Sequence, residues 1–415
     1  MKILTLWHDL PSPYTGSSLP LFNLLRYLAQ KHSITLLSFR EMTQESRYTH
    51  DLNQYCELIE PIGITVPTSL AKQILYTARN TLSPQNLLSK NPSLFNFYYS
   101  ARMQARIRDL LSTREFDLIH ASGVMAHYVQ AVRLPKVVHS YDCMTEMYRQ
   151  KYLSMRSRAA QLFWWLQYLR MKRYEGNTFR KFDACVVVST REQQTVQTYF
   201  PDVNAVVVPS GVDSEFFTPV REGEEWPSLL FVGTMNYQPN IDAVIYFCSH
   251  IYERIKKDVP EARLYIVGRD PPKEVSRLSL DKSISVTGYV EDVRPYLSRA
   301  SVVVAPFVSG TTGIKAKVLE AMAMAKPVVS TSMGVQGIDV SPNENVLVAN
   351  EPEEFATQVI ELLNNPELRQ RIGSNGRKFV VTTCSWERAA ERLLQVFNES
   401  RDKWPDHVSR QSALS

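Results

Sequence analysis

The sequence predicts an α/β protein made of two doubly wound parallel-sheet domains. Apolar, β-branched runs alternate with amphipathic helical stretches along nearly the whole chain, which is the pattern of parallel sheets flanked by helices. A polar passage without apolar periodicity, residues 218–227, interrupts this alternation before it restarts, as a linker would. The length of 415 residues agrees with about two or three domains of about 150 residues each.

The first half carries the elements of one such domain, residues 1–217. Strands are expected at residues 2–7, 34–39, 116–121, 136–140, 183–189 and 205–210. A helix expected over residues 19–32 lies between the first two strands. Strand, helix and strand in this order form a β-α-β unit with two parallel strands.

The second half repeats the pattern over residues 228–380. Strands are expected at residues 228–233, 262–268, 283–289, 301–307, 327–332 and 345–350, and helices at 353–364 and 366–397. A helix over residues 381–400 is expected to return to the first domain, leaving a tail at 401–415. Two such domains facing a central cleft would bind a small molecule there.

Composition and cysteine use exclude several classes of protein. The chain is 44% hydrophobic, 10% aromatic and 21% charged, which is too apolar for a disordered chain and too mixed for a fibrous one. Its five scattered cysteines include no CxxC pair, so we expect reduced thiols and no zinc site. A short apolar run at the N-terminus and the lack of any stretch of about 20 apolar residues predict a cytoplasmic protein.

Glycine placement points to the second domain as the ligand holder. Only 15 residues are glycine, and nine of them fall between Gly211 and Gly337. Several, including Gly233 and Gly268, end predicted strands. Ligands of parallel sheets bind outside the carboxyl ends of the strands, where the backbone approaches them closely.

The segment 303–324, VVAPFVSGTTGIKAKVLEAMAM, carries the most chemistry. A strand leads through a Gly/Thr/Ser turn into a helix expected to start near Gly313. Free N–H groups at a helix start suit a diphosphate, and Lys315 and Lys317 add positive charge. Glu320 could accept the two hydroxyl hydrogens of a ribose diol. The alternative interpretation is a solvated helix face with ordinary caps.

This segment resembles the nucleotide-sugar signature of the family 4 glycosyltransferases of GT-B fold, in the variant G-T-x-x-K-x-K-x-L-E-A-M-A. Segments 233–247, 265–271, 286–307 and 326–339 agree in order and spacing. The resemblance covers about residues 1–395 and is strongest over 228–340. It implies a retaining enzyme that moves a sugar from a nucleotide-sugar donor to a glycan or lipid-linked acceptor, in cell-surface polysaccharide biosynthesis, with no cofactor and no metal.

The resemblance also implies roles for single residues. Glu320 would hold the donor ribose, Lys315 and Lys317 the diphosphate, and Tyr289 and Val290 would lie beside the nucleobase. The implied donor-binding set is Gly16, Gly233, Thr234, Gly268, Tyr289, Val290, Thr311, Thr312, Gly313, Ile314, Lys315, Lys317 and Glu320. The first glutamate of the family's Glu-x7-Glu motif is Thr312 here. This departure bears on which sugar is bound and on whether the protein is active.

In the first domain, His139 and Asp142 are the preferred candidates for contacts with acceptor or donor sugar. His139 ends a predicted strand, and Asp142 follows it closely. With Lys315, Lys317 and Glu320 they complete the candidate catalytic set. His8, His120 and His127 rank below them, and structural hydrogen bonding is the alternative for each histidine. Gly16 could admit a phosphate to the loop that precedes the first helix, although helix capping by Ser17 or Ser18 explains that loop equally well.

A basic, aromatic segment spans residues 151–182, with eight basic residues and one acidic residue, Glu175. It suits a helix on an anionic membrane surface, which would make the protein peripheral on the inner face of the cell membrane. The favoured alternative is a long helix whose aromatics pack in the first domain, with its basic residues solvated. No nucleic-acid module is recognised. Two other functions stay open, a non-catalytic nucleotide-sugar-binding scaffold and a nucleotide-sugar 2-epimerase.

Overall fold

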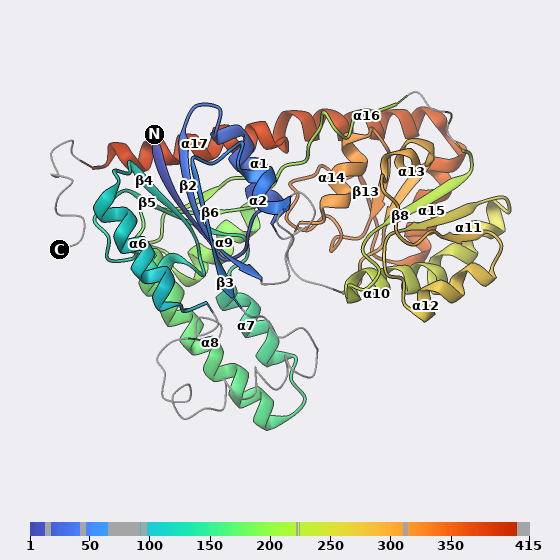
Figure 1. The fold of residues 1–415 in the computed structure, drawn as a ribbon. Helices are drawn as coiled ribbons and strands as arrows, with labels where there is room; N and C mark the ends of the chain where they lie inside the picture. The colour runs from blue at the N-terminus through green and yellow to red at the C-terminus, as the bar shows by residue number, and fades with distance from the viewer. Residues whose placement is uncertain are drawn as a thin grey trace. The chain divides into compact units, whose positions relative to one another are not determined.

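Two parallel β-sheets, each with helices on its faces, organise the chain (Figure 1). The computed structural model describes residues 1–12, 18–41, 47–64, 92, 98–220, 223, 225–309 and 314–404. The chain divides into unit 1, Met1–Val208 with Ala389–Ser415, and unit 2, Pro209–Arg388. The fold class predicted from the sequence, two doubly wound parallel-sheet domains, is confirmed.

Within the described residues, the sheet of unit 1 has seven parallel strands in the order β3-β2-β1-β4-β5-β6-β7. The strands are β1 (Lys2–Trp7), β2 (Ser33–Glu41), β3 (Leu58–Ile64), β4 (Leu118–Ser122), β5 (Lys136–Ser140), β6 (Ala184–Val187) and β7 (Ala205–Val207). The helices are α1 (Leu19–Leu28), α2 (Arg47–Leu52), α6 (Ala101–Thr113), α7 (Met144–Leu153), α8 (Arg158–Phe179), α9 (Thr190–Tyr199) and α17 (Trp386–Asp402). The strand order reverses direction between β1 and β4, which is the switch point of this sheet.

The sheet of unit 2 has six parallel strands in the order β10-β9-β8-β11-β12-β13, over the part of the chain that is described. The strands are β8 (Ser228–Val232), β9 (Arg263–Val267), β10 (Ile284–Val286), β11 (Val302–Ala305), β12 (Val328–Ser330) and β13 (Leu347–Val348). The helices are α10 (Gln238–Phe247), α11 (Glu253–Asp258), α12 (Lys273–Ser276), α13 (Arg294–Arg299), α14 (Ala316–Ala323), α15 (Pro352–Asn364) and α16 (Pro366–Thr383). Its switch point lies between β8 and β11.

Two elements differ from the sequence prediction for identifiable reasons. Strand β3 was not expected because its sequence, LIEPIGI, contains Pro61 and Gly63. It forms the edge of its sheet, where a proline is tolerated. The helix expected over 366–397 is two helices, α16 and α17, because Ser385 begins the second one: its hydroxyl accepts a hydrogen bond from the backbone N–H of Arg388 at 3.2 Å.

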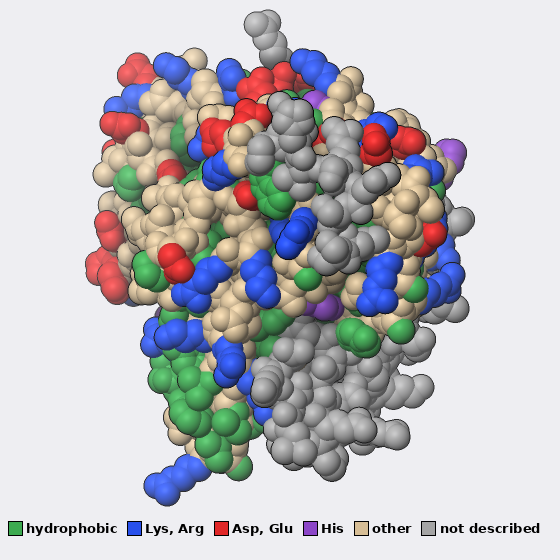
Figure 2. Space-filling view, turned by 90° about the vertical axis from the view of Figure 1, so that its left-hand side faces the viewer, with side chains coloured by type: hydrophobic (Ala, Val, Ile, Leu, Met, Phe, Trp, Pro, Cys, Tyr) green, Lys and Arg blue, Asp and Glu red, His purple; other side chains and the backbone are tan. Residues whose placement is uncertain are grey.

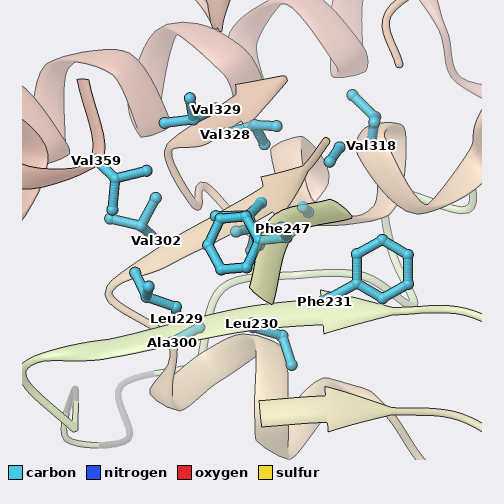
Figure 3. Packing of buried hydrophobic residues seen from close by; sticks show 14 of the residues in the cluster. Leu229, Leu230, Phe231, Phe247, Ala300, Val302, Val318, Val328, Val329 and Val359 are labelled. Atoms are coloured by element: carbon cyan, nitrogen blue, oxygen red, sulfur yellow. The ribbon is translucent and has the colours of Figure 1, made fainter. Parts of the chain in front are cut away.

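The core of unit 2 fixes the orientation of α14. Val318, Leu319, Ala321 and Met322 on this helix are buried, and Val318 packs in one cluster with Phe231 of β8 and valines of β11 and β12 (Figure 3). Lys317 and Glu320, one helical turn apart on another face of the same helix, are only half-buried. The apolar pattern of α14 therefore holds its charged face near the carboxyl ends of the strands.

In unit 1, α7 and α8 form a hairpin that projects from the sheet (Figure 1). Aromatic pairs join them, with ring centroids of Tyr148 and Trp164 5.6 Å apart and those of Tyr152 and Tyr168 5.7 Å apart. No helix in the described ranges is both long enough and apolar enough to cross a membrane.

Candidate functional site

The switch point of unit 2 brings together residues from three elements. β8 ends at Val232 and leads to Gly233, β11 ends at Ala305 and leads to Phe307, and α14 begins at Ala316. In an open parallel sheet, loops at the switch point separate and leave room for a ligand at the carboxyl ends of the strands. Residues at this point are therefore the first candidates for a binding site.

Gly233 and Gly268 allow two loops to approach each other closely. A β-carbon at Gly268 would collide with the carbonyl of Gly233, and one at Gly233 would collide with the ammonium of Lys317 and lie 2.9 Å from the amide nitrogen of Asn240. The backbone N–H of Gly233 donates to the carbonyl of Val267 at 2.9 Å. Glycine is needed at both positions because any side chain would displace this lysine or separate the loops.

The ammonium of Lys317 is held by one hydrogen bond and two aromatic rings. Nζ donates to Oδ1 of Asn240 at 2.7 Å, and it lies 4.9 Å from the ring centroid of Phe231 and 5.1 Å from that of Phe307. Asn240 is oriented in turn, since its Nδ2 donates to the carbonyl of Thr234 at 2.8 Å. The charge of Lys317 is thus positioned in advance of any ligand.

Burial brings the pKa values of Lys317 and Glu320 close to 7. It lowers the pKa of Lys317 to about 7, with the Glu320 charge opposing the change. It raises the pKa of Glu320 to about 7, with the Lys317 charge again opposing. Strongly shifted groups close together mark candidate functional sites. An anion bound at Lys317 would favour its charged form.

The remaining donor-side candidates of α14 and its loop lie at the start of the helix. The helix begins at Ala316, with Lys315 as its N-terminal cap residue, rather than near Gly313 as expected. The ammonium of Lys315 lies 5.6 Å from the ring centroid of Phe307, and Ile314 packs against the core. The predicted site residues Gly16, Thr311, Thr312 and Gly313 lie outside the described residues.

Tyr289 and Val290 follow the carboxyl end of β10, which is the second strand from β8 in the sheet. Tyr289 is 72% exposed, whereas Val290 is half-buried and packs on the core. Gly288 just before them has φ of +71°, a conformation that favours glycine. An exposed ring on a shaped loop is available to a planar ligand such as a nucleobase.

The switch point of unit 1 has a different chemistry. His139, at the end of β5, is buried, and its Nδ1 lies 3.3 Å from Nε2 of the buried His120. The rings of Trp7 and Tyr141 contact His139, with centroids 5.6 Å and 4.7 Å from it. Burial lowers the pKa of His139 to about 3, so its imidazole is neutral. A ligand would reach this side chain only after the cluster opened.

The other first-domain candidates are held by local contacts. Asp142 is half-buried, and its carbonyl accepts a hydrogen bond from the Ser140 hydroxyl at 2.9 Å. Nδ1 of His8, the residue after β1, lies 3.1 Å from Oγ of Ser122, the last residue of β4. Nδ1 of His127 lies 2.9 Å from the carbonyl of Val124. Catalytic roles for His139 and Asp142 stay predictions.

Two residues of α10 belong to the site although the sequence analysis did not select them. Asn240 holds Lys317, and Asp242 accepts hydrogen bonds from Gln238 and from the hydroxyl of Ser309, the last described residue before the loop of α14. The sequence signal for Asn240 was a polar residue beside the apolar residues that this helix buries, such as Ile241 and Val244.

This arrangement suits a nucleoside diphosphate group. An oriented cation beside a loop that only glycine permits can bind phosphate oxygens, and a carboxylate one turn away can accept hydroxyl hydrogens. An exposed aromatic side chain at the same sheet edge can stack on a base.

Comparison with known proteins agrees with this chemistry. Residues 16–216 match the family model described as Glycosyltransferase Family 4. Residues 226–365 match the model described as Glycosyl transferases group 1.

Curated relatives match parts of the chain. An uncharacterized glycosyltransferase of Methanocaldococcus jannaschii, MJ1178, is 28% identical over 205 residues, covering 48% of this chain and 54% of that protein. The GDP-mannose-dependent α-(1-6)-phosphatidylinositol dimannoside mannosyltransferase of Mycobacterium tuberculosis is 27% identical over 208 residues, 46% of this chain and 51% of that protein. The chain thus spans about half the length of these relatives.

Solved structures share the fold over nearly the whole chain. The protein HepE of Anabaena, solved in complex with UDP, superposes with a TM-score of 0.67 at 15% identity, covering 96% of this chain and 100% of that one.

Proposed function

The chain belongs to the family 4 glycosyltransferases of GT-B fold, and on that premise we propose that it transfers a sugar from a nucleotide-sugar donor to a glycan or lipid-linked acceptor with retention of anomeric configuration. The observation that carries this proposal is the pair Lys317 and Glu320 beside Gly233, at the switch point of unit 2. We further propose that the protein acts in cell-surface polysaccharide assembly at the inner face of the cell membrane.

Lys317 and Lys315 bind the diphosphate in this proposal, and Glu320 binds the ribose. The bond between the anomeric carbon and the phosphate oxygen breaks, and the acceptor oxygen bonds to that carbon on the same face. The acceptor proton passes to the departing phosphate, whose negative charge the lysines stabilise. We propose that the lysines and the N-terminus of α14 do this without a metal or other cofactor.

The names of one sequence relative and one structural neighbour suggest which donors and acceptors to test. One carries GDP-mannose dependence and a phosphatidylinositol-linked acceptor in its name, and HepE was solved with UDP. Both nucleotides are therefore tested first. A lipid-linked acceptor agrees with the first of these relatives.

Calorimetry of the purified protein against UDP-, GDP- and ADP-sugars, with and without Mg²⁺ or a chelator, tests the proposal. We expect one nucleotide class to bind without metal and to be hydrolysed slowly or transferred when acceptors are supplied. A ligand present at 100 times its Kd adds about 2.7 kcal/mol to the free energy of unfolding, which a thermal shift detects.

Binding without hydrolysis or transfer would instead favour the scaffold function, which the threonine at position 312 motivates. Binding that needs Mg²⁺ would contradict the metal-free part of the proposal. No binding to any nucleotide would contradict the whole of it.

A further inference from the structure

A stripe of exposed apolar side chains runs along the outer face of α8. Leu162, Trp165, Leu166 and Leu169 are 58%, 42%, 37% and 40% exposed. Their spacing of i, i+3, i+4 and i+7 puts them on one face of the helix. Leu153, at the end of α7, is 52% exposed as well. A contiguous exposed apolar patch of this kind marks an interaction site.

The fold of the hairpin does not need this stripe. The opposite face of α8 already packs on α7 and on the unit, with Gln167 and Met171 buried there and Trp164 against Tyr148. The stripe thus faces away from a hairpin interface that is complete without it. Its apolar side chains have a cost in water that only a partner outside the described residues would remove.

Exposed basic residues lie at both ends of the stripe. Arg158 precedes Leu162 by four residues and Arg173 follows Leu169 by four, so both lie on the face of the stripe, and both are exposed. Lys151, Arg156 and Lys172, also exposed, lie near its ends. The sequence from residue 147 to residue 174 contains no Asp or Glu. Figure 2 shows this apolar area on the lower part of unit 1, with Lys and Arg side chains above it and at its tip.

The base of the hairpin is held firmly. The buried carboxylate of Glu175, on α8, accepts hydrogen bonds from the backbone N–H groups of Met144 and Thr145 at 3.0 Å and 2.9 Å. Glu192 accepts one from the backbone N–H of Cys143 at 2.9 Å. These bonds satisfy the free N–H groups at the start of α7. The stripe is therefore held in a fixed orientation relative to the rest of unit 1.

We propose that this face of the α7–α8 hairpin binds the surface of an anionic phospholipid bilayer, with the apolar stripe among the upper acyl chains and the basic residues among the headgroups. A convex apolar face framed by charge of one sign fits a lipid surface. A second copy of this chain would place two sets of like charges against each other. This inference rests on the proposed function for its biological setting. It deepens that function by naming the surface through which the protein would bind the membrane that holds a lipid-linked acceptor.

Co-sedimentation of the full-length protein with vesicles tests this. The probes are vesicles of phosphatidylcholine alone and vesicles of three parts phosphatidylcholine to one part phosphatidylglycerol. We expect at least tenfold tighter binding to the anionic vesicles, weakening as salt is raised. Equal recovery with both vesicles, or none with either, would overturn the proposal.

Two variants separate the apolar and the basic contributions. Leu162→Gln with Leu166→Gln and Leu169→Gln should reduce anionic-vesicle binding at least tenfold, and Arg158→Gln with Arg173→Gln should reduce both the binding and its salt dependence. The matched controls are Leu280→Gln and Lys282→Gln, exposed residues of unit 2, which should bind as the parent does. Thermal unfolding of every variant checks that the fold is kept. Vesicle binding unchanged in both hairpin variants would overturn the assignment to this face.

Nucleotide binding, measured on the same samples, separates this inference from the proposed function. The hairpin variants should bind nucleotide as the parent does, because their substitutions lie far from α14 in sequence and in another unit. Nucleotide binding without vesicle binding overturns the hairpin inference alone. Vesicle binding without nucleotide binding overturns the proposed function and leaves the hairpin inference standing. Sedimentation velocity tests the alternative partner. If the parent protein is an oligomer that binds no vesicles and the stripe variant is a monomer, the partner is a second copy of this chain and the lipid proposal is wrong.

Discussion

At the switch point of unit 2, α14 places Lys317 against Gly233, the residue after β8, with Glu320 one turn further along the same helix. At the switch point of unit 1, His8, the residue after β1, contacts Ser122, the last residue of β4, with Nδ1 and Oγ 3.1 Å apart. Both sheets are parallel and doubly wound. The chemistry at the same topological position nevertheless differs, because one side holds groups that can be charged and the other holds neutral rings.

Burial disfavours the charged form of the side chains at both places, but the consequence near pH 7 differs. In unit 2 it leaves Lys317 and Glu320 able to change charge near pH 7. In unit 1 it keeps His139 neutral down to about pH 3, inside a cluster with Trp7 and Tyr141. We infer that unit 2 supplies the binding electrostatics and that the buried His120 and His139 of unit 1 contribute mainly to packing.

The largest expected effect comes from Lys317→Met. It removes the positioned ammonium, and the loss of about 3 kcal/mol of charge-assisted bonding should raise the Kd of the nucleotide about a hundredfold. The free energy of unfolding should stay the same or rise, because the desolvation that disfavours the charged form of Lys317 is relieved. Calorimetry and urea unfolding measure both. Lys282→Met, at an exposed position two residues before β10, is the control, and equal losses in the two variants would contradict the assignment.

Glu320→Ala should weaken nucleotide binding tenfold or more, from the loss of about 1.5 to 3 kcal/mol of hydrogen bonding to the ribose. The effect should disappear for a 2′,3′-dideoxynucleotide, which offers no diol. Calorimetry with both ligands measures this difference, and Glu344→Ala, at an exposed position, is the control. An equal loss with both ligands would show that Glu320 acts through structure and not through the diol.

The pH dependence of nucleotide affinity should be bell-shaped with its maximum near pH 7. Above that pH, Lys317 loses its proton and its attraction for the diphosphate, since its pKa is lowered to about 7. Below it, Glu320 gains a proton and ceases to accept both hydroxyls, since its pKa is raised to about 7. Calorimetry across this range detects the bell. A flat profile in the parent protein would contradict both assignments.

Asn240→Ala should have a smaller effect, about three- to tenfold on Kd, since it removes one neutral acceptor from Lys317. Without that acceptor the pKa of Lys317 falls further, so the alkaline side of the bell should move to lower pH. This displacement separates positioning of Lys317 from general damage. Asn375→Ala, whose side chain also donates to a backbone carbonyl, should leave the profile unchanged.

His139→Gln should leave nucleotide affinity unchanged and alter only the response of stability to acid. Burial lowers the pKa of His139 in the folded protein to about 3, so the parent protein should lose stability as pH falls from about 6.5 to about 3, and the lost proton linkage should reduce that slope by up to about 1.4 kcal/mol per pH unit. Urea unfolding at several pH values measures the slope. An altered Kd would instead place His139 in the binding site.

The strands of both sheets could be predicted because their apolar runs are continuous and end in polar or glycine residues. β1, for example, is Lys2–Trp7 in both prediction and structure. Strand β3 could not, since Pro61 and Gly63 read locally as turn residues and only the edge position in the sheet makes them acceptable. The break before α17 depends on the cap formed by Ser385, which a periodic apolar pattern hides.

The site was predictable where its chemistry lies in one segment. Lys315, Lys317 and Glu320 are close in sequence, so spacing alone grouped them. Asn240 was missed because it reaches Lys317 from 77 residues away in sequence. The burial of His139 was missed for the same reason, since the rings that enclose it come from different strands and loops.

The last helix has a consequence for the order in which this chain can fold during synthesis. Unit 1 is discontinuous, because Ala389–Ser415 completes it after all of unit 2 has been made. Phe397 of α17 packs its ring 5.2 Å from that of His120, and Leu393 and Val396 are buried beside it. On the ribosome, the first 208 residues therefore emerge without the helix that covers them, while unit 2 is continuous and can fold as it emerges. A released chain that ends at Arg388 should thus bind nucleotide while its N-terminal part still recruits chaperones.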